Sequence, residues 1–259
     1  MRQVTRVYAR ERQRQIREIL SSSGRVTVTA LAEHFAVTTE TVRRDLDQLA
    51  AQELLVRVHG GAVPRSTTEV EPDLDSRRTT HVEAKRRIAL AAARLLPTDP
   101  RAAVLLDAGS TTAELLPHLA PRRGPVITNA PAIAQGALVH TELEVHLLPG
   151  RVRPTTQAAV GSATVDAVRA LNSEVAFLGC NGLDAEGFTT PDPDEAAVKS
   201  AMVRSAGRRV VLADSSKAGT RHLVTFARST EIDALVTDGA LPDEIHSSLV
   251  EAGIEVIQA

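Results

Sequence analysis

Seven short apolar runs, most of them separated by helical patterns, dominate the sequence from residue 83 onward. They are AVLLDA (103–108), PVITN (125–129), EVHLLP (144–149), EVAFLGC (174–180), RRVVLAD (208–214), ALVTD (234–238) and IEVIQ (254–258). Helices are expected over residues 83–96, 111–119, 131–139, 162–171, 195–206 and 243–252. Near-continuous apolar strands that alternate with helices are typical of a mostly parallel sheet covered on both faces. We therefore expect an α/β domain over residues 83–259.

The first 65 residues follow a different order. A helix over residues 7–24, a short extended piece at 25–28 and a second helix over 30–37, capped by Thr29, come first. A third helix, capped by Thr38 or Thr39, and a two-stranded ribbon that turns at Gly60-Gly61 follow. This is the order of a winged helix-turn-helix, expected over residues 8–65. Residues 66–82 are polar and have no clear period, so we expect a linker there.

Charge is distributed unevenly between these parts. Residues 1–65 contain 11 Arg and 7 acidic residues, whereas residues 66–259 contain 19 Lys and Arg and 25 acidic residues. A basic piece joined to an acidic body is expected of a small anion-binding module attached to a larger domain. Chance variation in charge is an alternative that these counts alone leave open.

The third predicted helix, in TTETVRRDLDQL (38–49), has one apolar and one polar face. On a helical wheel the outward residues are Glu40, Thr41, Arg44 and Gln48, with Arg43 at the flank. Arginine can donate two parallel hydrogen bonds to guanine, while threonine hydroxyls and free N–H groups at a helix start hold phosphate. The i,i+4 pairs Glu40–Arg44 and Arg43–Asp47 describe an ordinary solvated helix equally well. This helix alone leaves both interpretations open.

Polar clusters follow four of the apolar runs. They are DAGSTT (107–112), Thr128-Asn129, Cys180-Asn181-Gly182 and DSSK (214–217). Ligands of open α/β sheets bind at the carboxyl ends of the strands, so we expect these clusters to form one polar pocket. Gly109 permits a tight turn and the hydroxyls after it suit an anion, although a plain helix cap explains the same residues. The spacing matches neither a P-loop nor a dinucleotide-binding motif.

Two lysines can supply positive charge to this pocket. Lys217 ends one cluster, and Lys199 lies on a predicted helix, where a solvated face is an equal alternative. The eight histidines show no metal-ligand spacing, and one cysteine gives no zinc set, so we expect no metal and no cofactor.

Features that direct a chain to a membrane or out of the cell are missing from this sequence. The N-terminus is charged and lacks the apolar region of a secretory signal. No run approaches the roughly 18 apolar residues of a membrane span. The single cysteine, Cys180, permits no intrachain disulfide and is expected to be a small buried hydrophobe. We therefore expect a cytoplasmic protein.

The segment Val26–Val63, VTVTALAEHFAVTTETVRRDLDQLAAQELLVRVHGGAV, closely resembles the N-terminal signature of the DeoR family of bacterial transcriptional repressors. In that family the matching arginine pair lies on the recognition helix, and R-x-HGGA forms the wing. Asp45 is expected to brace the helix from inside, because DNA would repel an acid. Glu53 departs from the family, which usually has glycine after this helix. The resemblance implies contacts with double-stranded operator DNA from Thr38, Thr39, Thr41, Arg43, Arg44, Gln48, Arg57 and His59.

The rest of the chain, from about Lys85 to Ala259, resembles the C-terminal sensor domain of the same family. The similarity rests on KRRIALAAARLL, DAGSTT, VITN, LGCNGLDAEGFT, AAVKSAM and VVLADSSK. That domain has a fold similar to ribose-5-phosphate isomerase, which implies a phosphorylated sugar or related metabolite as effector. Two departures are Pro149-Gly150 in place of a usual Gly-Gly, and Ala218 where the family tends to have an aromatic residue.

The resemblance also implies which residues contact the effector. Phosphate contacts are expected from Ser110, Thr111, Thr112 and Lys217. Hydroxyl contacts are expected from Asp107, Asn129, Asn181 and Asp184. The expected site is completed by Gly109, Thr128, Gly182 and Lys199.

Three functions are compatible with these features. The first is a repressor of carbohydrate-metabolism genes that a phosphorylated sugar releases from DNA. The second is a sugar-phosphate isomerase with an accessory DNA-binding domain; the isomerases that the body resembles carry Glu directly before the Lys equivalent to Lys199. Here that residue is Val198, which cannot abstract a proton, although Glu195 lies one turn earlier. The third, a constitutive architectural DNA-binder, leaves the polar pocket unexplained. We expect a regulator and not an enzyme, and a symmetric dimer or tetramer to match palindromic operators.

Overall fold

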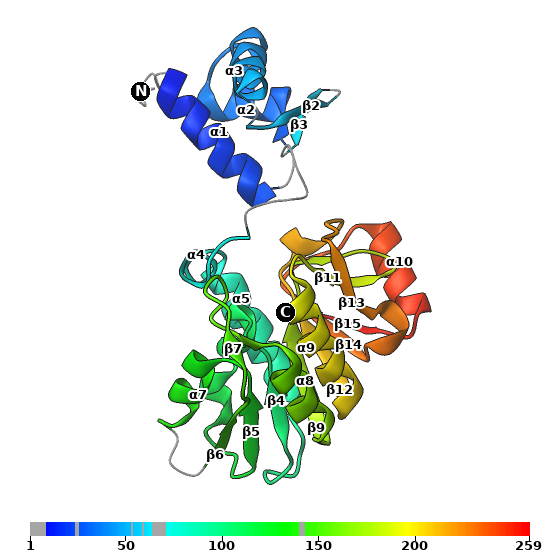
Figure 1. The fold of residues 1–259 in the computed structure, drawn as a ribbon. Coiled ribbons are helices and arrows are strands. Elements are labelled where there is room, and N and C mark those ends of the chain that lie inside the picture. The colour runs from blue at the N-terminus through cyan, green and yellow to red at the C-terminus, as the bar shows by residue number, and fades with distance from the viewer. Residues whose placement is uncertain (1–8, 24–25, 53, 59, 64–70, 140–142) are drawn as a thin grey trace. The chain divides into compact units, whose positions relative to one another are not determined.

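The computed structural model describes residues 9–23, 26–52, 54–58, 60–63, 71–139 and 143–259. The chain divides into two compact units, Met1–Glu69 and Val70–Ala259 (Figure 1). Each unit has its own hydrophobic core, and each is considered by itself below.

The N-terminal unit is the predicted winged helix-turn-helix. Its helices are α1 (Ala9–Ser23), α2 (Val28–Phe35) and α3 (Thr39–Ala51). Its strands β1 (Val26–Thr27), β2 (Val56–Val58) and β3 (Gly61–Val63) form an antiparallel sheet in the order β1-β3-β2. Gly61 permits this pairing, because a Cβ there would lie 1.9 Å from the Val26 carbonyl oxygen. Gly60 makes the turn at a φ of +77°, which favours glycine.

Threonine caps set the geometry of the helix-turn-helix. The Thr38 side chain accepts a hydrogen bond from the Thr41 N–H and begins α3, as predicted. The cap of α2 is Thr27, whose hydroxyl accepts from the Ala30 N–H at 3.2 Å. The sequence-based choice of Thr29 is wrong, because α2 begins at Val28 and Thr29 already lies inside its first turn. Ala36, at a φ of 50°, ends α2 in the left-handed region.

In the described part of the C-terminal unit, seven strands form one parallel sheet in the order β15-β14-β12-β9-β4-β5-β6 (Figure 1). All seven predicted apolar runs belong to it. The strands are β4 (Val104–Leu106), β5 (Pro125–Thr128), β6 (Glu144–Leu147), β9 (Ser173–Gly179), β12 (Ala206–Leu212), β14 (Ala234–Thr237) and β15 (Glu255–Gln258). From β4 the chain continues outward to β6, then returns to β9 and continues the other way. The order therefore reverses between β4 and β9.

Helices cover both faces of this sheet, as the alternating pattern predicted. Alternate residues of each strand face opposite cores; in β9, Val175 and Phe177 face one core and Ala176 and Leu178 the other. The first core also contains residues of α5 (Val82–Ala92), η2 (Leu116–Leu119) and α7 (Pro131–Ala137). The second contains residues of α8 (Ser162–Arg169), α9 (Pro193–Ser205) and α10 (Asp243–Glu251). Further short helices are α6 (Ser110–Ala113), η1 (Ala93–Leu95), η3 (Ser215–Lys217) and η4 (Ser229–Glu231).

Several short elements were not predicted. The strands β10 (Gly182–Leu183), β11 (Gly187–Thr190) and β13 (Val224–Arg228) form a small antiparallel sheet, and β7 (Arg151–Val152) pairs with β8 (Ala159–Val160). Strands of two to five residues are too short to show a period in the sequence.

The linker predicted over residues 66–82 is wrong for its second half, which contains helix α4 (Leu74–Thr79). Asp73 caps this helix by accepting from the Ser76 N–H at 2.8 Å. The Leu74 side chain is buried, and its N–H donates to the Thr155 carbonyl at 2.9 Å. Buried Lys85 donates to the Arg77 and Thr80 carbonyls at the other end of α4. These contacts explain why a polar segment without a period is ordered.

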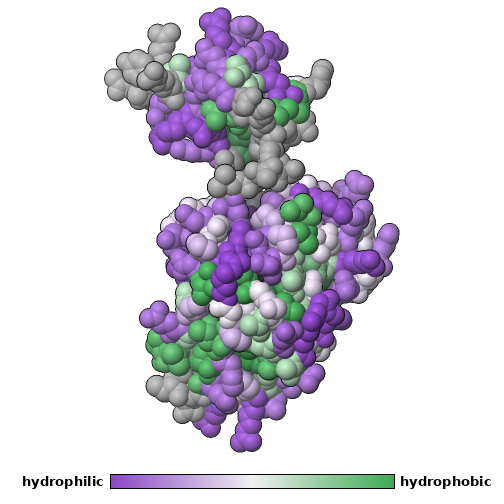
Figure 2. Space-filling model, viewed as in Figure 1, coloured by the Kyte–Doolittle hydropathy of each residue, from purple (hydrophilic) through white to green (hydrophobic). Residues whose placement is uncertain are grey.

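The surface of the C-terminal unit carries apolar residues at one edge of the sheet. Figure 2 shows hydrophobic residues gathered in the region of α7 and β6. Leu138, Val139 and Leu147 lie in this part of the chain and are all exposed. No helix among the described residues is both long and apolar enough to cross a membrane.

Candidate functional site

Helix α3 presents two arginines to solvent. Val42, Leu46 and Leu49 are buried in the core of the N-terminal unit, so the opposite face of the helix is exposed. Arg43 and Arg44 are both exposed. The predicted division of this helix into an inward and an outward face is confirmed.

Asp45 braces this helix from within, as predicted. Its side chain is buried, and its Oδ2 lies 2.5 Å from Nε of Arg12 on α1. Gln13 on the same helix donates to Asp45 Oδ1 at 3.1 Å. The acid on the recognition helix is therefore neutralised inside the unit and does not face the outer surface.

The i,i+4 pairs that offered a purely structural explanation for the arginines are not formed. Arg43 lies 3.5 Å from the carboxylate of Glu40, one turn before it. The Asp47 carboxylate lies 3.0 Å from Arg57 Nε on β2. No ion pair joins Arg44 to any residue in the described part of the chain. Arg44 is thus the cation on this face best able to meet an external anion.

The other predicted DNA contacts differ in whether their side chains already form hydrogen bonds within the unit. Thr39 is exposed, whereas the Thr38 and Thr41 hydroxyls hydrogen-bond to each other at 2.9 Å. Gln48 accepts from Gln13 at 2.6 Å. Arg57 joins the ribbon to α3 and donates to the Gly61 carbonyl at 3.1 Å, so it supports the wing. His59 and Glu53 lie outside the described residues.

A polar pocket lies where the strand order of the large sheet reverses. The space among its lining atoms, with open solvent included, is about 330 Å³. Asp107, Asn129 and Asn181 come from the ends of β4, β5 and β9. This is the position at which open α/β sheets bind ligands. The pocket is lined by Arg77, Asp107, Ala108, Gly109, Asn129, Thr156, Ala158, Asn181, Glu195 and Lys199.

Asp107 is the most heavily hydrogen-bonded side chain of the pocket. It accepts from the Gly109 N–H at 2.8 Å, from the Thr112 hydroxyl at 2.7 Å and from the Gly179 N–H at 2.7 Å. It also forms a buried ion pair with Lys199, which donates in addition to the Gly179 carbonyl at 2.9 Å. Asp107 and Lys199 therefore neutralise each other and tie β4, β9 and α9 together.

Asn129 has a free acceptor in the pocket. Its Nδ2 donates to the Ala159 carbonyl at 3.0 Å, which fixes the orientation of the amide. Its Oδ1 is buried and has no partner among the described residues. Buried polar atoms are nearly always hydrogen-bonded, so such an atom lining a pocket indicates a place for a ligand donor.

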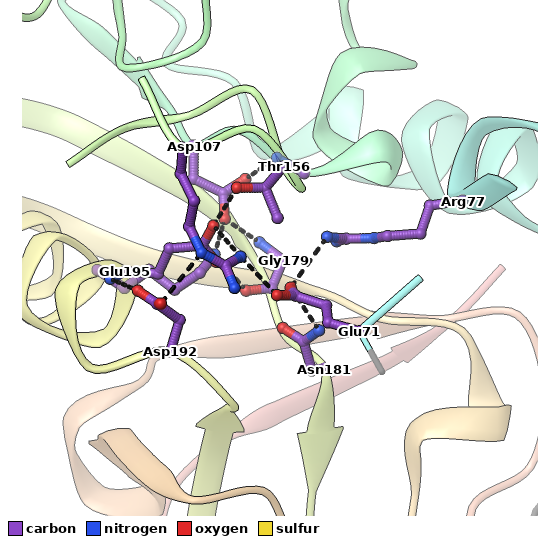
Figure 3. Close-up of polar contacts among 11 residues, drawn as sticks. Glu71, Arg77, Asp107, Thr156, Gly179, Asn181, Asp192 and Glu195 are labelled. Atoms are coloured by element: carbon purple, nitrogen blue, oxygen red, sulfur yellow. Dashed lines mark hydrogen bonds and ion pairs between the residues drawn. The ribbon is translucent and has the colours of Figure 1, made fainter. Parts of the chain in front are cut away.

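Arg153, in the β7–β8 hairpin, gathers three carboxylates beside the pocket (Figure 3). Its guanidinium lies 2.5 Å from Glu71, 3.0 Å from Asp192 and 3.2 Å from Glu195. Burial opposes the charge of Arg153, but the hydrogen bond to Glu71 and the neighbouring carboxylates outweigh it and raise its pKa. Glu195 also accepts from the Thr156 hydroxyl.

Several predicted effector residues do not line the pocket. Thr112 donates to Asp107, and the Thr128 hydroxyl accepts from the Ala130 N–H. Asp184 accepts from the N–H groups of Glu186 and Gly187 and so shapes the turn after β10. Also outside the lining are Ser110 and Thr111, both buried in α6, Gly182 in β10 and half-exposed Lys217 in η3.

The lining contains residues that the strand-end argument did not predict for the effector site. Arg77 comes from α4, Thr156 and Ala158 from the β7–β8 region, and Glu195 from α9. Cys180 is buried, as expected, and burial raises the pKa of its thiol to about 12. Val198 is buried in the core, and the Glu195 carboxylate is held by Thr156 and Arg153.

Comparisons with known proteins agree on both units. The DeoR-like helix-turn-helix domain matches residues 12–68, and the DeoR C-terminal sensor domain matches residues 80–239. The HTH-type transcriptional regulator GlpR of Haloferax volcanii is 38% identical over 95% of this chain and 96% of that protein. The glycerol-3-phosphate regulon repressor of Escherichia coli is 30% identical over 95% of this chain and 97% of that protein.

Similarity to solved structures is weaker. Ribose 5-phosphate isomerase A from Neisseria gonorrhoeae aligns at 16% identity with a TM-score of 0.40, over 55% of this chain and 56% of that chain. An alignment at this level carries no conclusion about activity.

Proposed function

This chain belongs to the DeoR family of DNA-binding transcriptional regulators, and from that premise we propose that a phosphorylated sugar releases it from operator DNA. The protein is a repressor-type regulator of carbohydrate metabolism and not an enzyme, in keeping with its relatives. The observation that carries the proposal is the pocket at the reversal of strand order, in which Asn129 Oδ1 has no described partner.

The pocket has the composition expected of a sugar-binding site. Hydroxyl groups need both donors and acceptors, and the lining offers the amides of Asn129 and Asn181 together with the Thr156 hydroxyl. Arg77 brings positive charge for a phosphate, whereas the charge of Lys199 is already balanced by Asp107.

DNA binding is proposed to use the outer face of α3. The exposed Arg44, with no ion-pair partner among the described residues, and the neighbouring Arg43 are the main candidates for base and phosphate contacts. The remaining predicted contacts to DNA and effector, and the homo-oligomer, stay predictions.

A panel of sugar phosphates tests the proposal. Purified full-length protein is melted with ribose 5-phosphate, fructose 1-phosphate, glycerol 3-phosphate and their unphosphorylated counterparts. A ligand at a hundred times its Kd adds about 2.7 kcal/mol to the stability of the folded state, so the true effector raises the melting temperature.

The effector found in this way is then titrated into a complex with duplex DNA selected by the protein from a random pool. We expect release of the DNA as the effector concentration rises. Stabilisation by unphosphorylated sugars alone would contradict the proposed effector class. A tighter DNA complex in the presence of effector would show that the direction of the switch is wrong.

A further inference from the structure

The Glu71 carboxylate lies beside the polar pocket, although the sequence predicted a linker at this position. Glu71 lies just after the first compact unit, which ends at Glu69, and inside the segment predicted to be a linker. Its side chain is only 5% exposed, although nothing in its local sequence requires burial. Figure 3 shows its carboxylate between Arg77 and Asn181.

Three donors from three different elements converge on this one carboxylate. Arg153 donates to Oε2 at 2.5 Å, and Asn181 donates to Oε1 at 3.3 Å. Arg77 Nη1 on α4 lies 3.7 Å from Oε1. Two guanidinium groups and an amide around two oxygens form the arrangement by which proteins bind carboxylate and phosphate groups.

The three groups differ in which other partners would fix their positions if the Glu71 carboxylate moved away. Arg153 keeps Asp192 and Glu195, which fix its guanidinium in place. Arg77 has no second carboxylate partner among the described residues, and neither does the Asn181 amide. The donor set would therefore persist as a preformed site with one uncompensated cation.

We propose that Arg77, Arg153 and Asn181 form the anion subsite of the effector pocket, and that the Glu71 carboxylate occupies it until a phosphate group takes its place. This rests on the proposed function only in that the phosphate belongs to the effector. The sugar part then lies toward Asn129, Asp107 and Lys199, which line the pocket together with Arg77 and Asn181; Arg153 and Glu71 lie outside that lining. Glu71 is thus an internal competitor for this subsite.

This placement differs from the one that the sequence implied, in which Ser110 to Thr112 and Lys217 hold the phosphate. None of those residues lines the pocket, and the Thr112 hydroxyl is already used by Asp107. The two placements make opposite predictions for variants of Arg77 and Lys217.

The test is calorimetric titration of the full-length protein with inorganic phosphate. If the Glu71-occupied state accounts for about 90–99% of molecules, removing the competitor tightens phosphate binding roughly tenfold to a hundredfold. Glu71→Ala should show this gain, and Glu71→Gln, which keeps the size of the side chain, should show a gain in the same direction.

The matched control is Glu255→Ala. Glu255 also pairs with an arginine, Arg208 at 2.8 Å, but it lies at the amino end of β15, away from the carboxyl ends that form the pocket. The Glu255→Ala substitution removes the same charge from the same unit as Glu71→Ala, and it should leave phosphate binding unchanged. In the Glu71→Ala background, Arg77→Ala should abolish the gain, whereas Lys217→Ala should keep it.

The outcomes separate this inference from the proposed function. Unchanged, weaker or absent phosphate binding in both Glu71 variants, with their melting curves showing folded protein, would overturn the subsite and leave Glu71 a structural ion pair. Loss of the gain in the Lys217 variant but not in the Arg77 variant would move the phosphate to the placement that the sequence implied. Tighter phosphate binding without any sugar phosphate releasing DNA would uphold the subsite and refute the proposed effector.

Discussion

Each unit contains an arginine–carboxylate pair, buried in the first and partly buried in the second, but the two pairs lie differently relative to the proposed binding surfaces. In the N-terminal unit Asp45 turns inward from the recognition helix and meets Arg12 behind it. In the C-terminal unit Glu71 meets Arg153 beside the pocket itself. Under the two proposals above, the first pair positions a binding surface without competing for it, whereas the second occupies part of one. Location relative to the ligand, and not the chemistry of the pair, decides which role a buried ion pair has.

The largest effect that would test this contrast is loss of the Asp45–Arg12 pair. Asp45→Ala removes the buried carboxylate that accepts from Arg12 and Gln13, and loss of a hydrogen bond to a charged group typically costs about 1.5–3 kcal/mol. Hydrogen exchange of the α3 amides at increasing urea concentrations measures the loss. Asp47→Ala, which removes an exposed partner of Arg57, should cost less than about 1 kcal/mol. Similar losses in the two variants would show that the buried pair does not brace the helix.

A second effect separates bracing from recognition on the same helix. Arg44→Ala should weaken operator binding by about 1–3 kcal/mol, roughly tenfold or more, because a base-reading arginine is lost. Stability should be unchanged, since Arg44 is exposed and no ion pair joins it to a described residue. Arg14→Ala, on the exposed face of α1, removes the same charge and serves as control in a fluorescence anisotropy titration. Equal losses of operator affinity in both variants would show that Arg44 contributes only a non-specific positive charge.

A third effect concerns the helix that follows Glu71. Burial lowers the pKa of Lys85, which holds the end of α4, to about 8. Between about pH 8 and 10.5 the folded protein has lost this proton while the unfolded chain keeps it. Unfolding therefore takes up a proton, and the contribution of Lys85 to stability rises with pH over this range.

The measurement is the melting temperature at pH 7.5 and pH 10. Lys85→Met should lack the rise that the wild type gains from this group. Arg86→Met, at the exposed neighbouring position on α5, should retain it. A wild-type pH dependence in the Lys85 variant would mean that the lysine does not titrate in this range.

Much of the fold was predictable because its strands are near-continuous apolar runs. A run such as that of β9 is buried on both faces, so its composition alone identifies it. The same regularity predicted that Asp107, Asn129 and Asn181 would meet, because the ends of neighbouring parallel strands share one edge.

The charged residues in and beside the pocket that come from other elements could not be predicted in this way. Glu71, Arg77 and Arg153 come from a polar segment, a short helix and a hairpin without periodic pattern. Their positions depend on tertiary contacts such as that between the Leu74 N–H and the Thr155 carbonyl, which join residues far apart in the sequence. The local sequence contains no signal for such contacts.

The free oxygen of Asn129 has a consequence for selectivity among closely related sugars. In the described structure this acceptor is buried and unpaired, so a ligand hydroxyl that reaches it gains a hydrogen bond at no cost to another contact. A deoxy analogue that lacks this hydroxyl would leave the oxygen unpaired, as it is in the structure, a difference of about 1–3 kcal/mol, or roughly tenfold to a hundredfold in affinity. Under the proposed function, discrimination then comes from the hydrogen bond that the complete sugar gains, and a cell could hold a deoxy metabolite at moderate concentration without inducing the regulated genes.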